Sequence, residues 1–235
     1  MVSTPAEALP RAGFWARCAA WSLDAACLLP LIALLGASRM AHAFAEAGAA
    51  LHVLAGAIPR LLGDALGGMQ VAPIEMARQL LTDPTLVAAS ERLQGAIGAI
   101  LFTPLLLYVV LALPWSVLFE ASSWQATPGK RALVVADTQG RRLKAGHALQ
   151  RFLAASLSWL SLNIGHALAA LPPQLALHDR ISDTRVLRRT ASDRLPAWAK
   201  LWLSAQLLAA VVAVAWLFLW LQAAMQAAMQ QAIGF

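Results

Sequence analysis

Long apolar runs alternate with shorter polar segments along the chain. The apolar runs cover about residues 14–36, 97–119, 152–171 and 201–222. A helix needs about 20 apolar residues to cross the hydrocarbon core of a bilayer, so each run is long enough to be embedded in one. The pattern predicts an all-α polytopic membrane protein with about four membrane-embedded helical segments. We expect the first segment to be retained rather than cleaved as a signal peptide.

The composition also indicates membrane insertion. Hydrophobic residues make up 60% of the 235 residues and charged residues only 13%, whereas soluble domains contain about 25% charged residues. The net charge is +6, but the basic residues lie in loops between apolar runs, as is typical of loops that stay in the cytoplasm. Because no nucleic-acid-binding motif accompanies these residues, we expect the lipid bilayer, and not nucleic acid, to be the partner.

The polar segments divide the chain further. Residues 1–13 form a polar tail that we place in the cytoplasm, and residues 191–235 form a linker and a C-terminal membrane helix. Residues 37–96 carry apolar side chains at helical spacing, for example at Leu51 and Leu54. This spacing predicts an insert of two or three amphipathic helices on or near the membrane surface, which either caps the spans or docks a partner.

The loop 120–150 contains a short β element. Residues 133–136 are rich in β-branched and apolar side chains, and the Asp and Gly of 137–140 favour a turn after them. This pattern predicts a short cytoplasmic β-hairpin. The same strand can also pair with residues 184–187 if both segments lie on one side of the membrane.

The distribution of basic residues raises a conflict in topology. The loops 120–150 and 172–200 are both basic, so both are expected in the cytoplasm. A straight crossing by 152–171 would separate them, whereas a re-entrant segment that breaks near 163–165 would not. We favour the re-entrant interpretation, and an ordinary span with a basic outer loop is the alternative.

Two charged residues occur in the first apolar run. Arg17 and Asp24 are seven residues apart, so two helical turns bring them to nearly the same face, which Trp21 shares. An ionisable side chain at the centre of a membrane helix costs at least ~2.5–3.5 kcal/mol, so we expect both residues to have polar partners inside the protein. For Arg17 we expect Asp179 or the loop 127–131.

The third apolar segment offers a partner for Asp24. Four side chains on one face of this segment form a polar stripe: Ser156, Trp159, Asn163 and His166. Their spacing of i, i+3, i+7 and i+10 is helical. We expect Asn163 or His166 to contact Asp24.

The sequence carries no recognisable catalytic or metal-binding pattern. Cys18 and Cys27 would lie on opposite faces of one helix, and metal spacings and the common catalytic motifs are absent. His178 and Asp179 are neighbours, an arrangement that is more typical of a loop contact than of a catalytic dyad. We therefore expect no catalytic residues, no metal, no cofactor and no enzymatic activity.

Three short motifs in order resemble the RDD family of prokaryotic membrane proteins, which is named for one arginine and two aspartates. The motifs are Arg17-x-x-Ala20-x-x-x-Asp24, Thr127-Pro128-Gly129-Lys130-Arg131, and His178-Asp179-Arg180 followed by Thr184-x-Val186. The resemblance covers residues 11–190, within an RDD-like membrane domain of 14–190. The long connection 37–96 and a fourth span after the last motif depart from the usual pattern.

The resemblance implies a multi-pass protein of the bacterial cytoplasmic (inner) membrane. It implies a transport or structural charge site at Arg17, Asp24 and Asp179. Other residues would support that site: Trp21, Asn163, His166, His178, Thr127, Gly129 and Lys130. The family is regarded as transport-related, and sodium–proton exchange has been proposed for some members.

Two functional hypotheses follow from the residues and from the resemblance. The first is transport of an ion or small solute, coupled to a proton or another cation through the charged residues. The second is an accessory or scaffold subunit that binds another membrane protein, or a second copy of itself, through 37–96 and the last helix.

Overall fold

The structure is a computed structural model of the whole chain, and it describes residues 10–66, 74, 78, 81–137, 142–161, 163–188 and 194–233. Contacts divide the chain into two compact units. The first comprises Met1–Ile32 and Leu107–Gln206, and the second comprises Ala33–Leu106 and Leu207–Phe235. The first unit contains all three motifs of the charge site.

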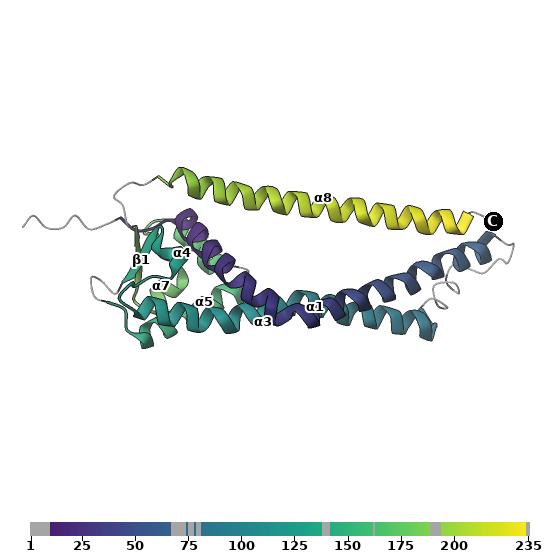
Figure 1. Cartoon of the computed structure of the whole chain (residues 1–235), viewed down its shortest axis with the longest axis horizontal. Helices are drawn as coiled ribbons and strands as arrows, with labels where there is room; N and C mark the ends of the chain where they lie inside the picture. The colour runs from purple at the N-terminus through teal and green to yellow at the C-terminus, as the bar shows by residue number, and fades with distance from the viewer. Residues whose placement is uncertain are drawn as a thin grey trace, which may run out of the picture. The chain divides into compact units, whose positions relative to one another are not determined.

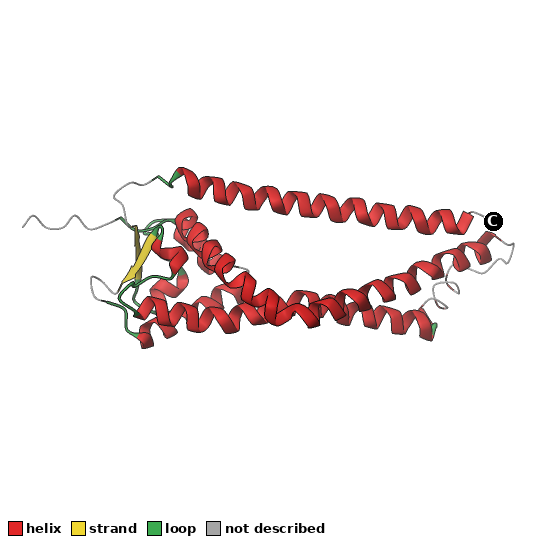
Figure 2. Ribbon diagram, viewed as in Figure 1, coloured by secondary structure: helices red, strands yellow, loops and turns green. Residues whose placement is uncertain are grey.

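Long helices, drawn in red in Figure 2, make up most of the described residues. These helices are α1 (Phe14–Leu66), α3 (Pro84–Ala121) and α8 (Ala197–Ile233) (Figure 1). Each is long and apolar enough to cross a membrane, and a bent pair of shorter helices provides a fourth candidate among the described residues. The predicted all-α membrane fold with about four embedded segments is confirmed.

The first two helices extend beyond the predicted spans. Helix α1 does not stop at residue 36 but continues to Leu66, and α3 begins at Pro84 rather than at 97. The residues after 36 are rich in Ala, which has the highest helix propensity, and single glycines such as Gly48 do not end a helix. Much of the expected insert therefore continues these two helices, and most of 67–80 lies outside the described residues.

The third apolar segment is broken. Helix α5 (Ala145–Leu160) is followed by α6 (Ile164–Ala167) and the short 3₁₀ helix η1 (Leu168–Ala170), and the axes on the two sides of the break differ by 113°. Asn163 takes a left-handed backbone conformation with φ of 65°, which Asn tolerates better than most residues. The predicted break near 163–165 is confirmed.

A two-stranded antiparallel sheet joins the two basic loops. Strand β1 (Val134–Asp137) pairs with β2 (Arg185–Arg188), with Val135 opposite Leu187; Figure 2 shows the strands in yellow. The predicted partnership of 133–136 with 184–187 is confirmed with a shift of one residue. The predicted local hairpin is not the pairing that β1 makes.

The sheet bears directly on the topology. Two strands that share backbone hydrogen bonds cannot lie on opposite sides of a bilayer, so the loops that carry β1 and β2 lie on the same side. The bent α5–α6 segment connects them. This arrangement favours the re-entrant interpretation over a straight crossing.

Accessibility labelling tests this topology. In a variant that lacks Cys18 and Cys27, we expect cysteines placed at exposed Lys144 or at exposed Arg180 to react with a membrane-impermeant maleimide from the same side of the membrane. Labelling of the two positions from opposite sides would exclude the re-entrant segment.

Small residues allow the helix starts in the first unit to approach closely. The core there is largely alanine, and it also holds Leu133 and Val186 from the two basic loops. Its members are Ala12, Ala16, Ala19, Ala20, Leu133, Val186 and Ala199. Close packing of small residues is typical of helix association in membranes. A second cluster around Leu28, Ile32 and Ala112 packs α1 against α3.

Candidate functional site

Asp24 is buried and accepts three hydrogen bonds from other elements. Its Oδ1 accepts from the backbone N–H of Gly129 at 2.8 Å and from the indole N–H of Trp115 at 3.2 Å. Its Oδ2 accepts from the hydroxyl of Thr127. Hydrogen bonds to an ionised group are about twice as strong as neutral ones. The carboxylate therefore ties α3 and the loop motif to α1.

The loop motif is shaped for this contact. Thr127 is the N-cap of the short helix α4 (Pro128–Arg131), and its hydroxyl accepts from the backbone N–H of Lys130 while donating to Asp24. Gly129 has no side chain, and a Cβ there would lie 2.6 Å from the backbone nitrogen of Asp24. Such a contact is far below van der Waals distance, so only glycine lets α4 come this close to α1.

Five further ionisable side chains form a continuous chain of ion pairs, which we call the charge network. In spatial order the members are Lys130, Glu120, Arg151, Asp179 and Arg17. Each carboxylate lies between two cations. The network links α4, α3, α5, α7 (Leu177–Ile181) and α1.

Arg151 is the central member of the charge network. Its Nη1 donates to both oxygens of Glu120 at 3.1 and 3.0 Å, and its Nε donates to Asp179 Oδ1 at 3.3 Å. Only 5% of Arg151 and 2% of Glu120 are exposed. Glu120 also pairs with Lys130. Burial raises the cost of leaving any of these charges without its partner.

Arg17 closes the other end of the network. Its Nη1 donates to Asp179 Oδ2 at 2.5 Å, and its remaining nitrogens donate to the carbonyls of Ala12 at 2.8 Å and Gln174 at 3.0 Å. Asp179 also accepts from the backbone N–H of Ala176 at 3.1 Å. The predicted pairing of Arg17 with Asp179 is confirmed.

The environment of Asp179 favours its ionised form. Burial raises the pKa of this carboxyl, but the guanidinium groups of Arg151 and Arg17 outweigh burial and hold the pKa at about 2. Asp179 therefore stays ionised over the whole physiological range, and its stabilising effect is lost only as the pH falls from 3.8 through about 2.

His178 is held in the neutral form next to the network. Burial lowers its pKa to about 3, and the charge of Arg151 acts in the same direction. Its ring lies 5.1 Å from that of His166, between ring centroids, and its Nε2 lies 3.5 Å from Asp179 Oδ1.

We therefore expect the protein to lose stability as the pH falls from 6.5 to about 3. In this window an unfolded histidine takes up a proton, whereas His178 in the folded state does not. His178→Gln should flatten the dependence of melting temperature on pH in this window. An unchanged profile in the variant would show that His178 is not the group responsible.

The structure does not bring all the predicted supporting residues to the site. Trp21 is half exposed and packs on Tyr108, and Asn163 is exposed in the turn between α5 and α6. The predicted contact of Asp24 with Asn163 or His166 is wrong. The polar stripe requires a continuous helix, but the chain turns at Asn163, and His166 packs on His178 instead.

Three important residues were not identified from the sequence. In the sequence, Glu120 follows the second apolar run, Arg151 precedes the third, and Trp115 is one of nine tryptophans. The available signal was that Glu120 and Arg151 border apolar segments and have opposite charge.

Among the described residues, no group of three or more His, Cys, Asp or Glu is arranged to hold a metal ion.

Comparison with known proteins gives a consistent assignment. The chain is 34% identical over 85 residues to the uncharacterized protein YxaI of Bacillus subtilis, a match that covers 35% of this chain and 56% of YxaI. No solved structure matches the chain. The family model of the RDD family matches residues 11–183, which include Asp24, the loop motif and every member of the charge network. The chain therefore belongs to the RDD family.

Proposed function

We propose that this RDD-family membrane protein transports a proton or another small cation, and that the charge network couples the ion to movement of the protein. The observation that carries the proposal is the position of Arg151 between two buried carboxylates, Glu120 and Asp179. Ionisable groups inside a membrane domain are costly, and they commonly mark ion pathways.

The geometry suggests how such coupling would work. A proton or cation that neutralises Glu120 competes with Arg151 and Lys130 for the same oxygens. Arg151 would then keep only its ion pair with Asp179, and Asp179 is also paired with Arg17. Loss of one ion pair would therefore change the strength of the remaining pairs. Because these pairs join α3, α5 and α7, the contacts between the three helices would change as well.

The proposal also places the protein in its membrane. Basic loops favour the cytoplasmic side, so the side that carries α4, α7 and the sheet would face the cytoplasm of a bacterial inner membrane. No catalytic activity forms part of the proposal.

Flux through purified protein in lipid vesicles tests transport. A pH-sensitive dye inside the vesicles should report proton movement when a sodium or potassium gradient is imposed. Glu120→Gln should reduce this signal to that of empty vesicles, whereas Glu91→Gln, at an exposed acid of the same helix, should retain it. Wild-type vesicles that behave like empty ones would refute the proposal.

A second candidate function rests on helix α8. Ala199 near its start is buried, but large apolar side chains further along the helix, such as Leu207 and Phe218, are exposed. These side chains need lipid or another protein around them. An accessory subunit that uses α8 to bind another membrane protein, or a second copy of this chain, would satisfy that need. Co-purification after cross-linking in the membrane, without any ion flux, would favour this alternative.

A further inference from the structure

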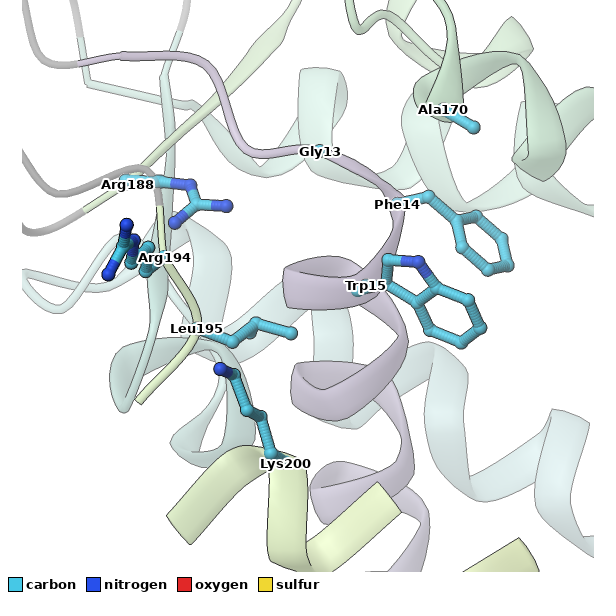
Figure 3. Close-up of a pocket in the computed structure, with 8 residues that line it drawn as sticks. All are labelled: Gly13, Phe14, Trp15, Ala170, Arg188, Arg194, Leu195 and Lys200. Carbon is cyan, nitrogen blue, oxygen red and sulfur yellow. The ribbon is translucent and has the colours of Figure 1, made fainter. Parts of the chain in front are cut away.

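A basic pocket that is lined by no member of the charge network lies beside the starts of α1 and α8. Its cavity measures about 350 Å³. Three cationic residues line it together with aromatic and small apolar ones: Gly13, Phe14, Trp15, Ala170, Arg188, Arg194, Leu195 and Lys200 (Figure 3). None of these residues is acidic.

The walls of the pocket are fixed by the fold. The segment before α1 is hydrogen-bonded to β2, from Ala12 N to Val186 O and from Arg188 N to Pro10 O, both at 2.8 Å. This contact fixes Arg188 beside the first turn of α1. On the other side, fully buried Ala199 and partly buried Leu195 pack into the alanine-rich core. Figure 3 shows Arg194 beside Arg188, with Leu195 and Lys200 next along the same wall.

The position of the pocket identifies the environment of its ligand. The apolar run of α1 starts at Phe14 and the candidate span of α8 starts at Ala197. Trp15 and Trp198 at these helix starts are 62% and 45% exposed, and exposed tryptophan is typical of the boundary between bilayer and water. The pocket therefore lies at the level where lipid headgroups lie.

We propose that this pocket binds the phosphate headgroup of an anionic phospholipid. Arg188, Arg194 and Lys200 supply the positive charge for the phosphate, and the aromatic and apolar residues receive the glycerol and the first part of the acyl chains. Basic pockets beside membrane helices bind acidic lipid headgroups through the same chemistry. Occupancy of the site would depend on the lipid composition of the membrane, and a bound lipid would contact the start of α1, the helix that carries Arg17.

Binding of a fluorescent phosphatidylglycerol to the full chain in neutral detergent tests the proposal. Each basic residue near the lipid surface contributes a factor of roughly five, so Arg194→Gln with Lys200→Gln should weaken binding about 25-fold. The control pair, Lys144→Gln with Arg180→Gln, removes two exposed charges elsewhere in the same unit. It should keep the affinity within twofold, and fluorescent phosphatidylcholine should bind weakly to all three proteins.

Further measurements separate the possible ligands. Soluble glycerol phosphate at millimolar concentration should fail to displace the lipid, and displacement at the lipid's own affinity would show a site for free phosphate and overturn the proposal. Equal affinity of the Arg194→Gln/Lys200→Gln variant and wild type would also overturn it. If that variant does not fold, the wild-type affinity must fall as salt rises, and a salt-independent affinity would overturn the proposal.

Discussion

Replacing Arg151 with methionine is expected to lower the free energy of unfolding by about 3–5 kcal/mol, the cost of removing one partner from a buried ion pair. Methionine fills much of the same space but donates no hydrogen bond. Glu120 would keep only Lys130, and Asp179 would keep Arg17 and the N–H of Ala176.

Thermal unfolding in detergent measures this effect. For a chain of this size, each kcal/mol corresponds to about 2–4 °C in melting temperature, so a decrease of at least about 6 °C is expected. Arg180→Met is the matched control, because Arg180 is exposed and its replacement should leave the melting temperature nearly unchanged. Similar melting temperatures for the two variants would mean that the charge network does not stabilise the protein.

Adding one methyl group at Gly129 is the second substitution with a large expected effect. In Gly129→Ala the new Cβ would lie 2.6 Å from the backbone nitrogen and 2.8 Å from the Cγ of Asp24. Helix α4 must then move away from α1, which lengthens the hydrogen bond from Gly129 to Asp24. Overpacking of this kind costs about 1–3 kcal/mol, and loss of the bond to a buried carboxylate adds to it.

A matched glycine provides the control for this substitution. A Cβ at Gly146, in the first turn of α5, meets nothing within 4 Å. Gly146→Ala should therefore leave the melting temperature unchanged or raise it slightly, because alanine favours the helix. Equal stability of the two alanine variants would contradict the close approach of α4 to α1.

Hydropathy predicted the membrane fold, and the distribution of basic residues predicted the broken third segment. The cost of a charge inside a membrane helix led to the expectation that Arg17 pairs with Asp179 or with the loop 127–131. The helix ends were not predictable in the same way. Apolarity decreases after residue 36, but alanine-rich sequence continues the backbone hydrogen bonds of α1 to Leu66. Hydropathy reports the environment of a helix, whereas its ends depend on backbone propensity.

The expected contact of Asp24 with the polar stripe failed because the chain turns at Asn163. Helical spacing placed His166 on the same stripe as Asn163, but a bend of 113° separates the parts of that stripe. Glu120 and Arg151 are 31 residues apart and meet only because α5 packs beside the end of α3. Sequence spacing within one helix carries no information about such a contact.

The structure also changes how the pairing of Arg17 with Asp179 should be tested. On the sequence alone, a charge reversal, Arg17→Asp with Asp179→Arg, is expected to restore the pair in part. Asp179 also binds Arg151, however, so an arginine at 179 would face another arginine. We therefore expect the reversed pair to remain damaged, and neutral replacements of similar shape are the better choice.

Arg17 and Asp179 should behave as energetically coupled members of one buried network. A double-mutant cycle of Arg17→Gln and Asp179→Asn, read out as thermal stability in detergent, measures this coupling. Contacting residues in one ion-pair network show interaction energies of about 0.5–3 kcal/mol. We predict a value in the upper half of this range, because only 13% of the Arg17 side chain and none of the Asp179 side chain is exposed. Additive effects of the two substitutions, within about 0.5 kcal/mol, would contradict the claim.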